Sequence, residues 1–289
     1  MAHSELASPS ATLAVLKQHG LHTRKALGQH FLVDDNAVGR IIDLASLAGD
    51  EHIVEVGPGI GTLTLALARA AGSVVTVESD DRLLGVLAEL TERYDNVRVV
   101  HADALDVTPD DLGGPAGQAP VALVANLPYA VAATVVLRFF EMLPTIQSAT
   151  VMVQAEVADR MSAVPGTKDY GAYTVKLAMF ARTTGRFSVG RGCFLPPPRV
   201  DSTVIRLERI VRDDSPEEIG RAIRAANAAF AQRRKTMRNS ISSALGVSAA
   251  SVEDSLSAAG LDPAARAESL RPESFVILGR ALHESGLLP

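Results

Sequence analysis

The chain has 289 residues, of which 47% are hydrophobic, so it is long enough for one or two domains with sizeable cores. Its one cysteine, Cys193, excludes an intrachain disulfide and a cysteine-based metal cluster, and it fits a reducing, cytoplasmic setting. The beginning of the chain lacks a cationic stretch followed by an apolar core, so we expect no signal peptide, and no apolar run is long enough to span a bilayer.

The net charge of -5 disfavours a nucleic-acid partner only weakly, because net charge hides local asymmetry. Residues 182–238 carry thirteen Lys and Arg against six Asp and Glu. A basic segment of this kind can face phosphate, or it can be an ordinary solvated arginine surface. Composition alone leaves both interpretations open.

The first 22 residues are predicted to form a lead segment with a short helix. Ser8 can cap this helix, with Pro9 at its first position and Gly20 just past its end. A second helix is expected over Asn36–Leu47, because its apolar residues recur at helical spacing.

From residue 52 onward, strands and helices are predicted to alternate. Short apolar runs predict strands at Ile53–Val56, Val74–Val77, Val97–Val100, Val121–Ala125 and Thr150–Val153. Helical periodicity falls between them, at Leu63–Ala70, Asp81–Arg93 and Val131–Met142. This alternation is typical of an α/β fold with a parallel sheet covered by helices on both faces.

The pattern changes towards the end of the chain. Apolar and polar residues alternate over Asp201–Leu207, which predicts a late strand. Ser215-Pro216-Glu217-Glu218 is a strong helix start, with a serine cap, a proline at the first position and a glutamate in capping-box position. No strand pattern follows about Arg209, and Pro272 is expected to open a last helix. We therefore predict a sheet domain over residues 23–211 and a small all-α domain over 212–289.

A glycine-rich turn follows the first predicted strand, within Glu55–Gly61. Gly57 and Gly59 allow the backbone to approach a ligand closely and to adopt positive φ. The spacing is G-x-G-x-G, and Thr62 stands where a dinucleotide-binding fingerprint has its third glycine. This spacing disfavours an NAD-dependent oxidoreductase, although a glycine turn alone is weak evidence for any ligand.

Two acidic residues follow the next two predicted strands. Glu78 ends the second strand, where an acid binds ribose hydroxyls in folds of this kind. Asp103 follows the third strand, and an acid there can accept a hydrogen bond from an adenine amino group. Glu78 alone could be a helix-start acid and Asp103 a turn residue. Their placement on successive strand ends beside the glycine turn favours a nucleoside cofactor site.

Asn126-Leu127-Pro128-Tyr129 directly follows another buried strand. An aromatic amine is a poor nucleophile because its lone pair is delocalised, and accepting hydrogen bonds from its protons favours the reactive form. The Asn126 side-chain carbonyl can accept one, and the backbone carbonyl at Leu127 the other. Pro128 stiffens the turn and Tyr129 can stack on a base. An ordinary strand-to-helix turn is the competing interpretation.

Together with the glycine turn, this segment predicts methyl transfer from S-adenosylmethionine to an exocyclic base nitrogen. The sulfonium charge disappears as the methyl group moves, so positioning supplies most of the acceleration and no metal is required. A second unusual run, Phe194–Ser202, contains three consecutive prolines that hold an extended loop. Phe194 could stack on the other side of the base, or the run could be a rigid connector.

These residues together resemble the rRNA adenine N6-dimethyltransferase family. The resemblance covers nearly the whole chain after about residue 22. It rests on segments 27–32, 55–61, 126–129, 194–202 and 230–239, with Glu78 and Asp103. It implies a Rossmann-like methyltransferase sheet followed by a helical RNA-contacting domain. The implied cofactor contacts fall at His30, Leu32, Gly57, Glu78, Asp103 and Asn126. Many members carry asparagine where this chain has His30.

The resemblance is strongest to the branch that dimethylates two adjacent adenosines near the 3′ end of 16S rRNA during 30S maturation. Arg233-Arg234-Lys235 and the later Glu268–Pro272 segment resemble that branch. A sister branch modifies one adenine of 23S rRNA and confers macrolide resistance. A DNA adenine methyltransferase or a non-catalytic assembly or transcription factor on the same fold are further alternatives.

The expected partner is therefore 16S rRNA within a 30S precursor particle, and the family expectation is a cytoplasmic monomer that is not bound to a membrane. We expect rRNA phosphate to be bound by four cations of the helical domain, Arg233, Arg234, Lys235 and Arg238. The alternative is that these residues form a solvated helix end.

Overall fold

The computed structural model describes residues 2–21 and 29–289. The boundary expected between residues 22 and 23 lies outside this range, as do Leu27 and Gly28 of the matched segment. The chain forms two compact units. The first comprises the described residues of Met1–Ala158 together with Thr183–Arg209, and the second comprises Asp159–Arg182 and Ile210–Pro289. No described helix is both long and apolar enough to cross a membrane.

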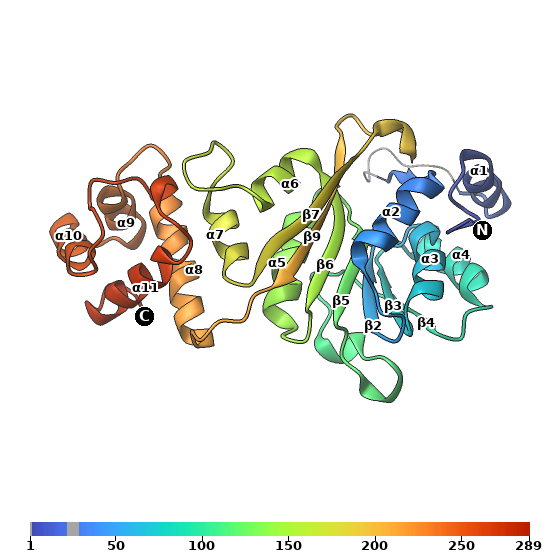
Figure 1. The fold of residues 1–289 in the computed structure, drawn as a ribbon, viewed down its shortest axis with the longest axis horizontal. Coiled ribbons are helices and arrows are strands. Elements are labelled where there is room, and N and C mark those ends of the chain that lie inside the picture. The colour runs from blue at the N-terminus through green and yellow to red at the C-terminus, as the bar shows by residue number, and fades with distance from the viewer. Residues whose placement is uncertain (1, 22–28) are drawn as a thin grey trace. The chain divides into compact units, whose positions relative to one another are not determined.

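A seven-stranded sheet is the frame of the first unit (Figure 1). Its strands are β2 (His52–Val56), β3 (Ser73–Glu78), β4 (Val97–His101), β5 (Ala122–Asn126), β6 (Ser148–Gln154), β7 (Ala181–Val189) and β9 (Ser202–Arg209). Their order is β4-β3-β2-β5-β6-β9-β7. The strands from β4 to β6 pair in parallel and β9 pairs antiparallel to β6. This mostly parallel sheet confirms the predicted α/β class.

The helices of the first part of the chain are α1 (Pro9–Gln18), α2 (Asp35–Ala45), α3 (Thr62–Ala70), α4 (Asp81–Thr91), α5 (Ala132–Met142) and α6 (Ala155–Met161). Figure 1 shows α2 and α3 next to each other against the sheet. Their apolar faces share one core cluster with the strands, in which Ile41 and Leu67 meet Ile53 and Val124. The predicted cap of α1 is confirmed, since the Ser8 hydroxyl accepts the Ala11 N–H.

The strand order places a switch point between β2 and β5. The chain moves outward from β2 through β3 to β4, and then returns to the other side of β2 with β5 and β6. Connections that leave two adjacent parallel strands in opposite directions open a crevice at their carboxyl ends, where open α/β sheets bind ligands. The glycine turn follows β2 and the Asn126 turn follows β5, so both predicted site segments flank this crevice.

Two features of the strand arrangement were not predicted. One is the strand β7, whose exposed positions carry Arg182 and Arg186 and whose centre contains Gly185. An edge strand with this composition lacks the apolar run that marks a buried strand. The other is a two-stranded sheet between β1 (Phe31–Leu32) and β8 (Phe194–Leu195), which joins segments far apart in the sequence.

The second unit consists of α7 (Ala172–Ala178), α8 (Pro216–Phe230), α9 (Met237–Leu245), α10 (Ala249–Ala258) and α11 (Ser274–Glu284). The predicted capping box is confirmed: the Glu218 N–H donates to the Ser215 hydroxyl at 3.3 Å, and the Ser215 N–H donates to the Glu218 carboxylate at 2.9 Å. Among the described residues no strand follows Arg209, as predicted. The last helix begins at Ser274, two residues after the predicted start.

The core of this unit includes residues that precede α7. Tyr170 is fully buried, and its hydroxyl donates to the Leu270 carbonyl at 2.8 Å. Phe230 lies between Tyr170 and Phe275, with ring centroids 6.0 and 5.8 Å away. Segment 159–182 therefore packs with the C-terminal helices although β7 and β9 separate it from them in sequence.

Helices α8 and α11 approach each other closely at Gly279. A Cβ atom at this position would lie 2.7 Å from the Arg221 backbone carbon. We predict that Gly279→Ala lowers the free energy of unfolding by about 1–3 kcal/mol, because it overpacks a helix crossing. Gly220→Ala in α8 is the matched control, since its Cβ would meet only the end of the Arg224 side chain at 3.5 Å. This control should stabilise by up to about 1 kcal/mol through helix propensity. Urea denaturation measures both, and equal effects of the two changes would contradict the prediction.

Candidate active site

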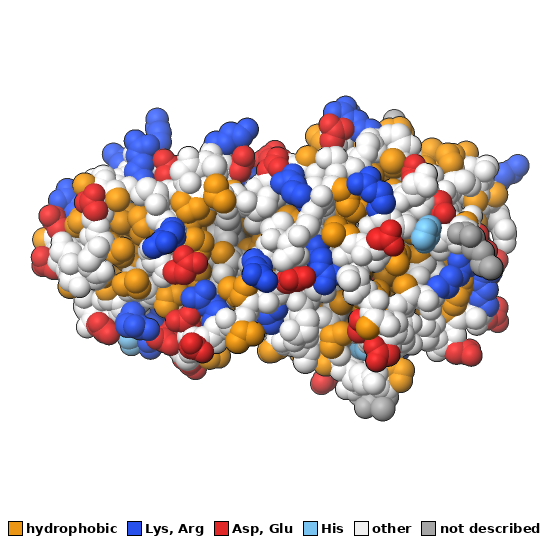
Figure 2. Space-filling view, viewed as in Figure 1, with side chains coloured by type: hydrophobic (Ala, Val, Ile, Leu, Met, Phe, Trp, Pro, Cys, Tyr) orange, Lys and Arg blue, Asp and Glu red, His pale blue; other side chains and the backbone are white. Residues whose placement is uncertain are grey.

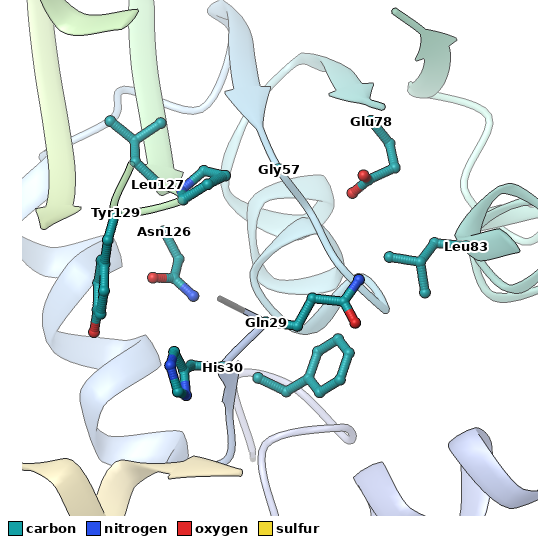
Figure 3. Close-up of a pocket in the computed structure, with 10 residues that line it drawn as sticks. Gln29, His30, Gly57, Glu78, Leu83, Asn126, Leu127 and Tyr129 are labelled. Carbon is teal, nitrogen blue, oxygen red and sulfur yellow. The ribbon is translucent and has the colours of Figure 1, made fainter. Parts of the chain in front are cut away.

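The switch point holds a pocket built from three strand ends and the segment before β1 (Figure 3). Its lining residues are Gln29, His30, Phe31, Gly57, Glu78, Leu83, Asn126, Leu127, Pro128 and Tyr129. Figure 3 shows Asn126, Tyr129 and His30 towards one side of this pocket and Glu78 and Leu83 towards the other. The structure therefore brings most of the predicted cofactor and reaction residues together.

Gly57 lets the two site loops approach each other. Its φ is +68°, and a Cβ atom there would lie 3.1 Å from Cδ of Pro128. Gly59 has a similar role, because its φ is +62° and a Cβ would lie 3.2 Å from the Phe31 ring. Only glycine combines this backbone conformation with such close neighbours. The two glycines that were predicted to bind the cofactor thus permit these close approaches, and Gly57 also lines the pocket.

Glu78 is held in place by two backbone amides. One carboxylate oxygen accepts the Gly59 N–H at 3.2 Å and the other accepts the Asp80 N–H at 2.8 Å. The side chain is 6% exposed, and burial raises its pKa above the ordinary value. An ionised carboxylate has about four acceptor sites, so two remain for a pair of neighbouring hydroxyls. This arrangement fits the ribose of a nucleoside.

Tyr129 and His30 form a stacked pair beside Asn126, with ring centroids 5.8 Å apart. The Tyr129 hydroxyl lies 2.6 Å from the Ser202 hydroxyl, and burial raises the pKa of the tyrosine. Nδ1 of His30 lies 2.7 Å from the Pro196 carbonyl oxygen, which can only accept, so Nδ1 carries a proton. The His30 side chain therefore ties the site to the proline loop.

A second pocket lies between Tyr129 and the proline loop. It is lined by His30, Tyr129, Gln154, Pro197, Pro198, Arg199 and Val200, and its volume of about 490 Å³ falls within the range of small-molecule sites. Gln154 was not among the predicted site residues. It ends β6, beside the Asn126 end of β5, so the rule that ligands bind at the carboxyl ends of parallel strands could have found it.

Four predicted site residues, Leu32, Gly59, Asp103 and Phe194, do not line either of these two pockets. Phe194 is 2% exposed, because its pairing with Leu32 turns the ring into the core against Met152 and Val204. Asp103 is exposed, and its carboxylate accepts the Leu105 N–H at 2.8 Å. Base stacking by Phe194 and adenine recognition by Asp103 stay predictions.

A third, smaller pocket adjoins the first and shares four of its residues. It is lined by His30, Phe31, Leu32, Glu55, Gly57, Pro58, Thr62, Leu63 and Asn126. Glu55 is fully buried, and burial raises its pKa from 4.5 to about 7. The Thr64 hydroxyl donates a hydrogen bond of 2.6 Å to its carboxylate, which opposes this rise in pKa. Gln29, Glu55 and Phe31 were within the matched segments but had no assigned role.

The predicted RNA-binding cations all lie in the second unit. Arg233, Arg234 and Lys235 are exposed in the turn between α8 and α9, and Arg238 follows at the start of α9. Arg233 donates to the Lys168 carbonyl, and Arg238 forms an ion pair of 2.7 Å with Glu253. Figure 2 shows Lys and Arg side chains projecting from the surface of the C-terminal helices. The described part of the chain contains no group of three or more His, Cys, Asp or Glu suited to a metal.

The raised pKa of Glu55 predicts a pH-dependent stability. Between pH 4.5 and about 7 the unfolded chain ionises this residue before the folded chain does, so stability is lost as pH rises. The loss should reach about 3 kcal/mol. Glu55→Gln should remove it, which urea denaturation between pH 5 and 8 can measure. The exposed Glu92→Gln is the control, and a Glu55→Gln profile parallel to the parent's would contradict the prediction.

A family model described as "Ribosomal RNA adenine dimethylase" matches residues 20–282. Relatives with the name "Ribosomal RNA small subunit methyltransferase A" align over most of the chain. The protein from Geobacillus thermodenitrificans is 40% identical, covering 97% of this chain and 98% of its own. The protein from Streptomyces griseus is 45% identical, covering 90% and 89%.

Two solved structures also align with most of this chain. A dimethyladenosine transferase from Plasmodium falciparum aligns with a TM-score of 0.71 and 22% identity, covering 89% of this chain and 98% of its own. At this identity, the similarity shows a shared fold. The 23S rRNA methyltransferase ErmE aligns with a TM-score of 0.63 and 30% identity, covering 88% and 99%. Because the family model and the relatives match it over nearly its full length, this chain belongs to the ribosomal RNA adenine dimethylase family.

Proposed function

We propose that this protein dimethylates the N6 amines of two adjacent adenosines near the 3′ end of 16S rRNA, with S-adenosylmethionine as the methyl donor, during 30S subunit assembly. One observation carries the proposal: the pocket that contains Glu78 opens onto the Asn126–Tyr129 turn, which suits a nucleoside cofactor beside an aromatic amine. The near full-length match to relatives named as small-subunit methyltransferases supports this substrate.

Bound S-adenosylmethionine supplies an electrophilic methyl group. Glu78 would hold the ribose hydroxyls through its two remaining acceptor sites, and Asp103 would accept from the adenine amino group. The Asn126 side-chain carbonyl accepts one proton of the target amine. The Pro128 carbonyl already accepts the Val131 N–H, so the Leu127 carbonyl is the backbone candidate for the other proton. Both bonds localise the nitrogen lone pair towards the methyl group.

The target base must leave its stack to reach this turn. We place it in the second pocket, where Tyr129 offers an aromatic surface. His30 covers one face of Tyr129 in this structure, so the base stacks on the other face or displaces the imidazole. We further propose that the enzyme acts as a cytoplasmic monomer on a 30S precursor, and that the helical unit binds rRNA.

Methylation of 23S rRNA is the second candidate function, because ErmE covers most of this chain at 30% identity. The higher identity and matching length of the small-subunit relatives favour 16S rRNA. A non-catalytic assembly factor is the third candidate. The presence of Glu78, Asn126 and Tyr129 in one pocket disfavours it.

The decisive experiment uses labelled S-adenosylmethionine with 30S particles that lack the adenosine dimethylations, followed by mapping of methylated nucleotides. We expect N6,N6-dimethyladenosine at two adjacent 3′-end positions. Asn126→Ala should lower the rate on the order of 100-fold, as loss of a positioned transition-state partner does elsewhere. Asn36→Ala, at an exposed position of α2, is the matched control. Label only on 23S rRNA would support the second candidate, and cofactor binding without transfer the third.

The proposed phosphate contacts predict a change in salt dependence. Arg234 and Lys235 are the informative pair, because replacing Arg233 or Arg238 would also remove a contact within the unit. The double change Arg234→Gln and Lys235→Gln should reduce the slope of log affinity against log salt by about 0.7–0.9 for each phosphate contact. The control replaces Lys17, an exposed cation of α1 in the first unit, by Gln. An unchanged slope for 30S binding would exclude these two residues as phosphate contacts.

A further inference from the structure

The third pocket contains a buried hydroxyl that the proposed mechanism does not use. Thr62 is 5% exposed, and its Oγ1 atom has no hydrogen-bond partner among the described residues. Thr62 lines the pocket of about 30 Å³, which exceeds the roughly 10–15 Å³ that one water requires. A buried hydroxyl without a partner costs free energy, so a polar occupant of this space would stabilise it.

The same position begins a helix that lacks a side-chain cap. Thr62 is the first residue of the nine-residue helix α3, and its N-cap is Gly61, which offers no side-chain acceptor. The first N–H groups of a helix have no partner within the helix and favour negative charge. The unpartnered hydroxyl and the uncapped helix start thus point to one ligand group, an anion with hydrogen-bond acceptors.

The neighbouring pocket residues decide which anion fits. This inference rests on the proposed function, which puts the ribose at Glu78 and the transferred methyl at Asn126. The amino-acid end of the donor then extends past Gly57 into the third pocket. This end carries a carboxylate and an ammonium group. Glu55 lines the same pocket, and its carboxyl group can accept a hydrogen bond from the ammonium of a zwitterion, which a simple anion lacks.

We propose that the Thr62 hydroxyl donates a hydrogen bond to the α-carboxylate of S-adenosylmethionine at the N-terminus of α3. Thr62 is thus a cofactor-binding residue that this chain places where a dinucleotide-binding fingerprint has glycine. The hydroxyl recognises only the carboxylate, and it takes no part in positioning the target amine.

The test compares two ligands that differ only in this group, S-adenosylmethionine and its decarboxylated analogue, by isothermal titration calorimetry. Thr62→Val should weaken binding of S-adenosylmethionine about tenfold, as expected for a hydrogen bond to a charged group, and should leave binding of the analogue unchanged. Thr62→Ser keeps the hydroxyl and should retain most of the affinity. Thr150→Val is the matched control, because Thr150 is also buried with an unpartnered hydroxyl but lies in β6 and lines none of the three pockets.

The outcomes separate this inference from the proposed function. Equal losses for both ligands, or no loss for either, would overturn the role of Thr62 and leave the proposed function intact. Failure of the unaltered protein to bind S-adenosylmethionine would instead refute the proposed function. If Thr62→Val does not fold, Thr62→Ala is compared with Thr62→Ser. An equal preference of these two variants for S-adenosylmethionine over the analogue would contradict recognition of the carboxylate by the hydroxyl.

Discussion

The site depends on one close approach, that of the β2–α3 turn to the turn after β5. These turns leave adjacent parallel strands, and they meet where Gly57 has no side chain and Pro128 presents its ring. The same turn then directs the Gly59 amide onto Glu78 and starts α3 without a cap. The sheet fixes both strand ends, so it holds these groups in set positions relative to one another. Such preorganisation is what a reaction accelerated mainly by positioning requires.

The proposed donor pocket and the proposed pocket for the target base are not independent. His30 and Tyr129 line both the first and the second pocket, and the imidazole is held by the proline loop through the Pro196 carbonyl. The pairing of β1 with β8 joins the same two segments through their backbones. A base that displaces His30 from Tyr129 would therefore disturb the wall of the donor pocket, which gives the two binding events a physical route for coupling.

Much of this architecture could be predicted from local patterns. Buried parallel strands are marked by continuous apolar runs, and every predicted strand is present within a few residues of its expected bounds. Caps such as Ser215 are equally local signals. The edge strand β7 escaped because Thr, Arg and Gly fill it, and the β1–β8 pair escaped because only tertiary contact defines it. The inward turn of Phe194 follows from that same pairing, which no local pattern reveals.

The helical unit has a further consequence for how such proteins are inherited. The chain passes between the two units three times, after residues 158, 182 and 209. Tyr170, contributed before the last two sheet strands, fills the space beside Phe230 and Leu270. Residues 212–289 taken alone would lack this part of their interior. A single recombination junction therefore cannot transfer the complete helical unit to another sheet domain. The two units are expected to have been inherited, and to diverge, together.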